Sequence, residues 1–179
     1  MVFQSDENKW TAQWLKDDSL LFVTTSGAVF YRLALSGEQK PVAVFNTKFE
    51  NNAPVVSSDG QWVAYQSVES GRWEVYVAAF PSFHGRRQVS NTGGCQPHWR
   101  KDGKELFYLS MDGNVMSVEM KPGETSAPRT LFRSSLMVDP YSNVWEVTGD
   151  GKKFIIGEPI GESGKPVNVV LNWSEGLKK

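Results

Sequence analysis

The sequence predicts an all-β fold, a β-propeller of about four four-stranded antiparallel blades, from two observations. First, an aspartate that is usually followed by glycine recurs just ahead of a β-type run, at Asp17, Asp59, Asp102 and Asp150, so that the repeats lie 42, 43 and 48 residues apart. Second, β-branched and aromatic residues lie in runs of four to eight bounded by Gly, Pro, Asn, Asp and Ser, and helical periodicity is hard to find. A period in this range is typical of radial arrays of four-stranded sheets.

The units also superpose residue by residue. Segment 53–65 of the second unit lies over segment 96–108 of the third, with Pro54 on Pro97, and the fourth unit at 147–156 keeps the frame more loosely. Asp-Gly pairs alone are common at turns, so this wider match is what indicates a true repeat.

Each unit continues from its first turn in the same order. A second turn comes next, at 26–27, 70–71, 112–113 and 163–164, and a β-rich run lies behind each, at 29–35, 73–80, 115–120 and 167–173. A fourth run closes the first three units, at 41–45, 86–89 and 129–132. We therefore expect one domain, 1–179, with blades at about 10–46, 52–90, 94–133 and 143–174. The last blade is one strand short, and Val2, Phe3 and Gln4 are the candidate closing strand, because an unpaired sheet edge invites association.

Composition agrees with one globular domain. The chain has 179 residues and 40% hydrophobic residues, enough for a sizeable core. Its net charge is −1 with scattered Lys and Arg, which disfavours nucleic acid and anionic membranes as partners. The longest apolar stretch, Val75–Phe80, is too short to cross a bilayer, and the first nine residues do not form a signal peptide. We therefore expect a soluble chain without membrane insertion, whose compartment is left open.

Segment 57–77 closely resembles the TolB-like, WD-repeat-like propeller repeat, and so does the ending 169–173 with its tail 177–179. The chain looks like the C-terminal sensory propeller of membrane-spanning bacterial serine/threonine kinases and of related orphan proteins. This resemblance implies a sensing or protein-interaction role and allows an extracytoplasmic location. It implies no phosphotransfer, because the kinase half is missing from the sequence. The usual turn of this repeat is Ser-Pro-Asp-Gly. In this chain the Pro position is held by Lys16, Ser58, Lys101 and Gly149, and the Gly position of the first unit is held by Asp18.

The predicted function is a non-catalytic ligand-binding or protein-interaction module, a sensor or scaffold, with no catalytic residue and no cofactor. One repeated aspartate per blade lies on a wide ring, where each side chain is expected to cap its own turn. The alternative is a small hydrolase or lyase with its site at the channel mouth. That alternative requires two carboxylates, or a carboxylate and a histidine, within about 5 to 10 Å of each other, and Glu50 and Asp139 are the candidates.

A metal site is not expected. Cys95 and His98 are the only cluster of soft ligands, and a separation of three on a regular strand sends them to opposite faces unless a bulge intervenes. The single cysteine also excludes an internal disulfide.

A ligand site is expected where the loops lead into the innermost strands, at one end of the central channel. These loops supply amides and aromatic faces without net charge, which suits a peptide or a carbohydrate-like ligand. The candidate ligand-binding residues are Trp10, Asn51, Asn52, Gln96, Tyr141 and Asn143.

Four blades shaped for a ring of six to eight leave an open arc with two apolar blade faces, which another protein surface must cover. We expect a homodimer in which two arcs close a larger ring. In this arrangement the segment Val2, Phe3 and Gln4 pairs with the partner's strand 167–173, which includes Asn168. The alternatives are a closed ring of four blades and a fragment of a larger propeller.

Overall fold

The computed structural model describes residues 6–24, 26–121, 124–135, 137–157 and 168–171. These residues form sixteen strands in four separate antiparallel sheets, and none of them lies in a helix. With one exception in the third sheet, consecutive strands are hydrogen-bonded neighbours within each sheet, which is the meander that a propeller blade requires. The predicted all-β propeller fold is confirmed.

Each sheet is one blade, numbered here in chain order. Blade 1 contains β1 (Lys9–Trp14), β2 (Ser19–Thr24), β3 (Val29–Ala34) and β4 (Val42–Asn46). Blade 2 contains β5 (Asn51–Val56), β6 (Trp62–Ser67), β7 (Glu74–Ala79) and β8 (Arg87–Gln88). Blade 3 contains β9 (Cys95–Trp99), β10 (Glu105–Leu109), β11 (Asn114–Lys121), β12 (Glu124–Thr125) and β13 (Arg129–Arg133). Blade 4 contains β14 (Trp145–Val147), β15 (Lys153–Ile156) and β16 (Asn168–Leu171).

Blade 3 differs from the expected four strands. The additional two-residue strand β12 pairs with the far end of β11, beyond the stretch of β11 that pairs with β13. Blade 4 has three strands among the described residues. The candidate closing strand at Val2, Phe3 and Gln4 and the turn at 163–164 lie outside the described residues.

A β-bulge interrupts the inner strand of each of the first three blades. In β5, Asn52 pairs with Gln66 and Val55 with Ala64, so three steps along β5 match two along β6. The same shift occurs in β1 and in β9. Proline cannot donate to a strand ladder and is confined to edges and bulges, which explains Pro54 and Pro97 at the shifted positions in blades 2 and 3.

The repeated aspartates cap their own turns, as predicted. The Asp59 carboxylate accepts hydrogen bonds from the Ser57 hydroxyl at 2.6 Å and from the Gln61 backbone N–H at 3.1 Å. Asp102 and Asp150 accept the backbone N–H two residues ahead in the same way, each at 3.0 Å. The pKa of Asp150 lies below its usual value, chiefly because the Thr148 hydroxyl donates to its carboxylate.

The residue after each aspartate has a left-handed backbone, and this gives a testable prediction. Gly60 has φ +73°, and a methyl group added to it would meet no atom within 4 Å. Replacing Gly60 with alanine should therefore lower the free energy of unfolding by about 1 kcal/mol through backbone strain alone. Asp18 occupies the equivalent turn position at φ +62°, so Asp18→Gly should relieve backbone strain, offset in part by loss of the exposed hydrogen bond that the Trp14 indole donates to Asp18 at 2.9 Å. Urea unfolding of both variants tests this pair, and an unchanged midpoint for Gly60→Ala would contradict it.

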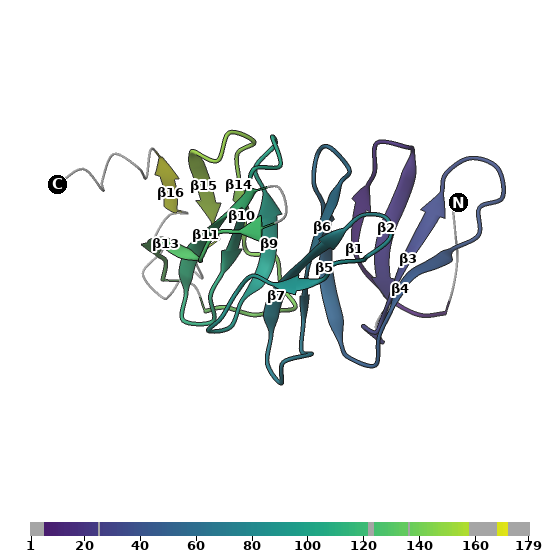
Figure 1. Ribbon diagram of the computed structural model, residues 1–179, viewed down its shortest axis with the longest axis horizontal. Coiled ribbons are helices and arrows are strands. Elements are labelled where there is room, and N and C mark those ends of the chain that lie inside the picture. The colour runs from purple at the N-terminus through teal and green to yellow at the C-terminus, as the bar shows by residue number, and fades with distance from the viewer. Residues whose placement is uncertain (1–5, 25, 122–123, 136, 158–167, 172–179) are drawn as a thin grey trace.

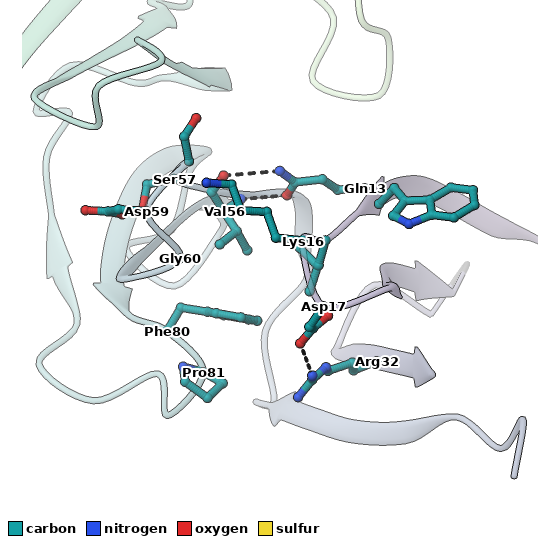
Figure 2. A pocket seen from close by; sticks show the side chains of 13 residues that line it. Gln13, Lys16, Asp17, Arg32, Val56, Ser57, Asp59, Gly60, Phe80 and Pro81 are labelled. Atoms are coloured by element: carbon teal, nitrogen blue, oxygen red, sulfur yellow. Dashed lines mark hydrogen bonds and ion pairs between the residues drawn. The ribbon is translucent and has the colours of Figure 1, made fainter. Parts of the chain in front are cut away.

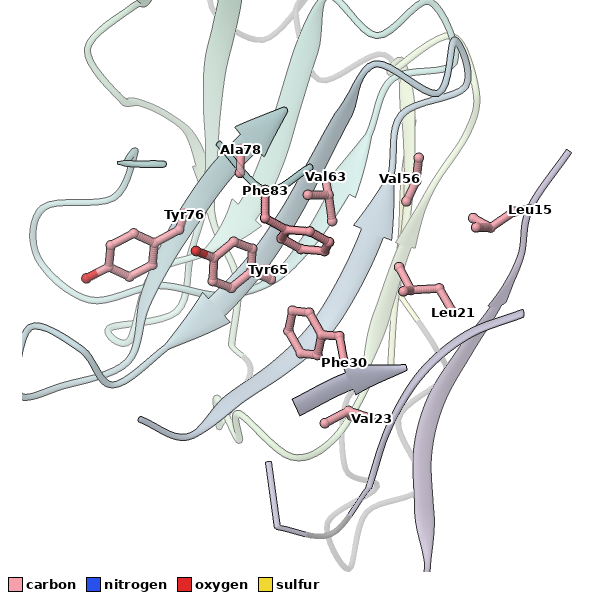
Figure 3. Close-up of a cluster of buried hydrophobic side chains, with 10 residues drawn as sticks. All are labelled: Leu15, Leu21, Val23, Phe30, Val56, Val63, Tyr65, Tyr76, Ala78 and Phe83. Atoms are coloured by element: carbon pink, nitrogen blue, oxygen red, sulfur yellow. The ribbon is translucent and has the colours of Figure 1, made fainter. Parts of the chain in front are cut away.

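The core consists of three apolar layers, each between two successive blades. Figure 3 shows most of the blade 1–blade 2 layer, in which Phe30 faces Tyr65 and Phe83. The blade 2–blade 3 layer is formed by Ala64, Val75, Val77, Val89, Leu106, Tyr108 and Val118. The blade 3–blade 4 layer is formed by Cys95, Phe107, Leu109, Val115, Leu131, Trp145, Phe154 and Ile156.

The four blades form an open arc. Blade 1 and blade 4 lie at opposite ends of the row of sheets in Figure 1. Within the described ranges, no buried apolar cluster joins these two blades. Among the described residues, one face of blade 1 and one face of blade 4 therefore have no neighbouring blade.

Candidate functional site

The candidate site lies at the end of the central channel where the inner strands of the blades begin. We call this end the channel mouth. It contains a larger cavity of about 320 Å³ and a smaller one of about 90 Å³. Trp10, Asn52 and Tyr141 line both cavities. The larger cavity is also lined by Ala53, Val55, Gln96, Pro97, His98, Pro140, Ser142 and Asn143.

The structure brings all six sequence-predicted residues together at the channel mouth. Asn51 lines the smaller cavity, Gln96 and Asn143 line the larger, and the other three line both. Their burial divides them into two groups. Trp10 is 44% exposed, Tyr141 is 51% exposed and Asn143 is also exposed, whereas the three remaining amides are buried. Ligand binding by these residues stays a prediction.

The buried amides hold the segment that carries Tyr141 across the mouth. Gln96 donates from Nε2 to the backbone carbonyl of Asp139 at 2.8 Å and accepts the Val144 backbone N–H at 3.2 Å. Gln66 donates from Nε2 to the Pro140 carbonyl at 2.6 Å, and its Oε1 accepts the Gln96 N–H at 2.8 Å. Both glutamines are therefore structural anchors, because their polar atoms are already engaged within the fold.

Asn51 anchors the connection between blades 1 and 2. Its Nδ2 donates to the Thr47 hydroxyl at 2.7 Å and to the Phe49 carbonyl at 2.8 Å. Its Oδ1 is buried without a hydrogen-bond partner among the described residues. A buried carbonyl oxygen of this kind is an acceptor for a water molecule or for a ligand donor in the adjoining small cavity.

Tyr141 is positioned by two contacts. Its ring packs edge-on against Trp73 with 5.7 Å between centroids. Burial and a hydrogen bond to the Glu50 carboxylate raise the pKa of Tyr141. The Asp139 carboxylate accepts the Tyr141 N–H at 3.0 Å and the Ser142 hydroxyl at 2.5 Å. The two candidate catalytic carboxylates, Glu50 and Asp139, are thus both engaged in holding the Tyr141 segment.

A histidine–carboxylate pair that sequence reasoning missed lies beside the larger cavity. His98 Nδ1 and a Glu146 carboxylate oxygen are 3.0 Å apart, a direct contact that is shorter than the separation of about 5 to 10 Å that the enzyme alternative uses. The His98 ring also packs edge-on against Trp145 at 4.6 Å. The hydrogen bond from His98 lowers the pKa of Glu146. His98 and Glu146 are 48 positions apart in the sequence. The one sequence feature that indicates their contact is that they hold equivalent positions in successive blades.

The expectation that Cys95 and His98 point to opposite faces is wrong. The bulge in β9 pairs Cys95 with Leu109 and His98 with Phe107, so both side chains face blade 4 and Trp145. Cys95 is fully buried in the blade 3–blade 4 layer, and burial raises the pKa of its thiol to about 12. No group of three or more potential metal-ligating side chains occurs in the described part of the chain.

A cavity of about 450 Å³ lies between blades 1 and 2, at the end of the channel opposite the mouth (Figure 2). Gln13 of blade 1 bridges its wall by donating to the Val56 carbonyl at 3.1 Å and accepting the Val56 N–H at 2.6 Å. Asp17 and Arg32 form an ion pair on the same side, as Figure 2 shows. These polar groups satisfy one another, and the sequence did not single out this cavity.

Comparison with known proteins identifies the fold. No family model matches the sequence, and no curated protein does. A solved structure described as TolB from Agrobacterium tumefaciens aligns with a TM-score of 0.69 and 23% identity over 87% of this chain and 55% of that chain. TolB from Acinetobacter baumannii aligns with a TM-score of 0.70 and 18% identity over 96% and 43%. An oligogalacturonate lyase in complex with manganese aligns with a TM-score of 0.70 and 16% identity over 99% and 52%.

The chain is therefore a β-propeller module with TolB-like blades. At these identities the likeness is one of fold, and the same fold serves a TolB protein and a lyase. The chain spans about half the length of the three solved structures. No helix able to cross a membrane occurs in the part of the chain that the structure describes.

Proposed function

We propose that this propeller is a non-catalytic binding module, a ligand-binding or protein-interaction domain of the sensor or scaffold type, whose site is the channel mouth. One observation carries the proposal. Trp10 and Tyr141 keep about half of their surface exposed beside a 320 Å³ cavity, although the glutamines that hold the Tyr141 segment are buried and engaged. Aromatic faces held by a rigid frame bind a ligand at a low entropic cost.

The lining of the larger cavity favours an uncharged ligand. It contains no Lys, Arg, Asp or Glu among the described residues, and its polar groups are amides, two hydroxyls, the Trp10 indole N–H and His98. Aromatic faces with a few neutral polar groups suit a peptide or a carbohydrate-like molecule. Charged ligands would leave an unpaired charge in such a cavity, which is costly.

A hydrolase or lyase at the mouth is the alternative, and the His98–Glu146 pair is the observation in its favour. We prefer binding because His98 is packed against Trp145 and Glu146 does not line the cavity among the described residues. The Glu50 and Asp139 carboxylates are engaged as well. Among the described residues, no carboxylate lines the larger cavity, where it could act on a bound molecule.

The test is a thermal-shift screen with uncharged oligosaccharides and peptides. A compound that binds the folded chain at 100 times its dissociation constant should raise the free energy of unfolding by about 2.7 kcal/mol. Trp10→Ala and Tyr141→Ala should abolish this shift without unfolding the protein, because both side chains are half exposed. Val42→Ala is the matched control, since Val42 is 61% exposed on the outer strand of blade 1.

Two outcomes would overturn the proposal. One is a compound that still binds with full affinity to both aromatic variants, which would place the site elsewhere. The other is chemical conversion of the bound compound that disappears in His98→Ala, which would establish the enzyme alternative.

A further inference from the structure

The smaller cavity of the channel mouth has one charged side chain in its wall, and that charge is negative. Glu50 supplies it, and no Lys, Arg or His lines this cavity among the described residues. The Tyr141 phenol donates a hydrogen bond to the Glu50 carboxylate. A carboxylate can accept about four hydrogen bonds, so this one leaves it able to accept others. None of the ion pairs in the described part of the chain includes Glu50.

The Glu50 side chain is held in place from both neighbouring blades. Gly27 has φ +67°, and a β-carbon on it would lie 2.7 Å from the Glu50 Cγ, so the missing side chain leaves the space that Glu50 fills. The Gly27 carbonyl accepts the Asn51 backbone N–H at 2.6 Å, and the Glu50 carbonyl accepts the Val68 N–H at 3.1 Å. The carboxylate is therefore oriented before any ligand arrives, which lowers the entropic cost of binding.

Asn51 adds a second negative group to the wall of the same cavity. Its residue is only 1% exposed, and its Nδ2 is turned toward the Thr47 hydroxyl and the Phe49 carbonyl. Its Oδ1 has no hydrogen-bond partner among the described residues. An amide oxygen without a donor leaves its partial negative charge uncompensated in surroundings of low dielectric constant. This partial charge and the Glu50 charge both favour a cationic occupant.

The size and walls of the smaller cavity restrict that cation. Its volume of about 90 Å³ compares with about 30 Å³ for one water molecule, so it has room for an ammonium group and the carbon that carries it. Trp10 and Tyr141 supply aromatic faces, which attract organic cations. A bare Ca²⁺ ion takes about 6–8 oxygen ligands, more than one carboxylate and one amide oxygen supply.

We propose that the smaller cavity binds the free N-terminal ammonium group of a peptide, whose uncharged chain continues into the larger cavity. The two cavities share Trp10, Asn52 and Tyr141 and therefore adjoin. An α-ammonium group is attached directly to the peptide backbone, so a chain that begins in one cavity enters the other at once. A lysine ammonium would need its four-carbon stem to cross the same short distance. This inference rests on the proposed function and selects peptides over carbohydrates as its ligand class.

The first test is calorimetric titration with a library of amidated tripeptides built from uncharged residues, in free-amine and N-acetylated forms. Amidation removes the terminal carboxylate, so the two forms differ in charge only at the N-terminus. The free-amine form of a binding peptide should bind roughly 10- to 100-fold more tightly than its acetylated form, because hydrogen bonds to a charged group are stronger than neutral ones.

The second test is Glu50→Gln, which removes the charge and keeps the length of the side chain and an acceptor for the Tyr141 phenol. The free-amine peptides should lose at least about 10-fold in affinity, whereas the acetylated forms should bind as before. Glu119→Gln is the matched control, because Glu119 is exposed and pairs with Glu105 at the other end of blade 3. It removes the same charge and should change neither affinity, and circular dichroism confirms that both variants are folded.

The outcomes separate this inference from the proposed function. Equal affinities for the two forms, lost together in Trp10→Ala, would overturn the ammonium site and leave binding at the channel mouth intact. No binding of either form at millimolar concentration would overturn both.

Two further results would overturn the assignment to a peptide N-terminus. One is a preference for the free amine that survives in Glu50→Gln, because the ammonium group would then be held elsewhere. The other is an acetylated peptide with one lysine that binds as tightly as the free-amine forms, because the cation would then come from a side chain.

Discussion

Phe30→Ala should lower the free energy of unfolding by about 3–5 kcal/mol, because it empties the centre of the blade 1–blade 2 layer. The Phe30 side chain is fully buried. Its ring lies 5.3 Å from Phe45, 5.6 Å from Tyr65 and 6.0 Å from Phe83, measured between centroids. Phe45 belongs to blade 1, whereas Tyr65 and Phe83, which Figure 3 shows, belong to blade 2. These neighbours cannot collapse into the space without moving one sheet against the other.

Chemical denaturation of Phe30→Ala beside the parent protein measures this loss. Single domains are stable by only about 5–15 kcal/mol, so the variant should unfold at a much lower denaturant concentration. Val42→Ala should change stability by less than about 0.5 kcal/mol, since Val42 is mostly exposed on the same blade. If Phe30→Ala cost no more than this control, the layer between the blades would not be what holds them together.

Local chemistry made the blades predictable. The Asp-Gly turns need only residues that are close in the chain, and the caps at Asp59 and Asp150 form within two residues on either side. The packing of flat side chains between blades follows from the repeat itself, because equivalent residues in successive blades must face each other. The sequence therefore predicted the propeller fold and the antiparallel meander of the blades, but not the additional strand β12 of blade 3.

The bulges were harder to predict, although the sequence contained their signal. Pro54 and Pro97 superpose in the repeat, and a proline within an inner strand indicates a bulge. Simple alternation of side chains was nevertheless assumed, and this placed Cys95 and His98 on opposite faces. The backbones of Ala53 and Gln96 take φ values of +49° and +52°, which no propensity for these residue types predicts.

The sequence predicted where the channel mouth lies, but only part of the contacts that hold it together. Trp10 and Tyr141 could be singled out because loops that lead into inner strands meet at one end of a propeller. Gln66 was missed because it lies within an otherwise apolar strand, and its role depends on a carbonyl 74 residues away. The pairing of His98 with Glu146 likewise depends on how two blades are set against each other. Contacts between distant segments of this kind have no local sequence signal.

Glu74→Ala should lower the free energy of unfolding by about 3 kcal/mol, although glutamate is normally a surface residue. Glu74 is fully buried in β7, and its carboxylate accepts the Gly93 backbone N–H at 3.0 Å, the Ser90 hydroxyl and the Arg72 Nε at 2.7 Å. Alanine would leave the Gly93 N–H and the Ser90 hydroxyl without this acceptor, and each unsatisfied buried group costs about 1–3 kcal/mol. Arg72 is mostly exposed and can return to water, so it adds little to the loss.

Glu69→Ala is the matched control, because Glu69 forms a partly exposed ion pair with Arg86 at 3.1 Å in the same blade. Its loss should be at most about 1 kcal/mol. Chemical denaturation measures the loss of unfolding free energy in both variants. Equal losses would show that the burial of Glu74 does not increase the contribution of its hydrogen bonds to stability. A larger loss at Glu74 has a further consequence, since Gly93 is two residues from Cys95, where β9 begins. The buried carboxylate then fixes the start of the strand whose Gln96 holds the Tyr141 segment across the channel mouth.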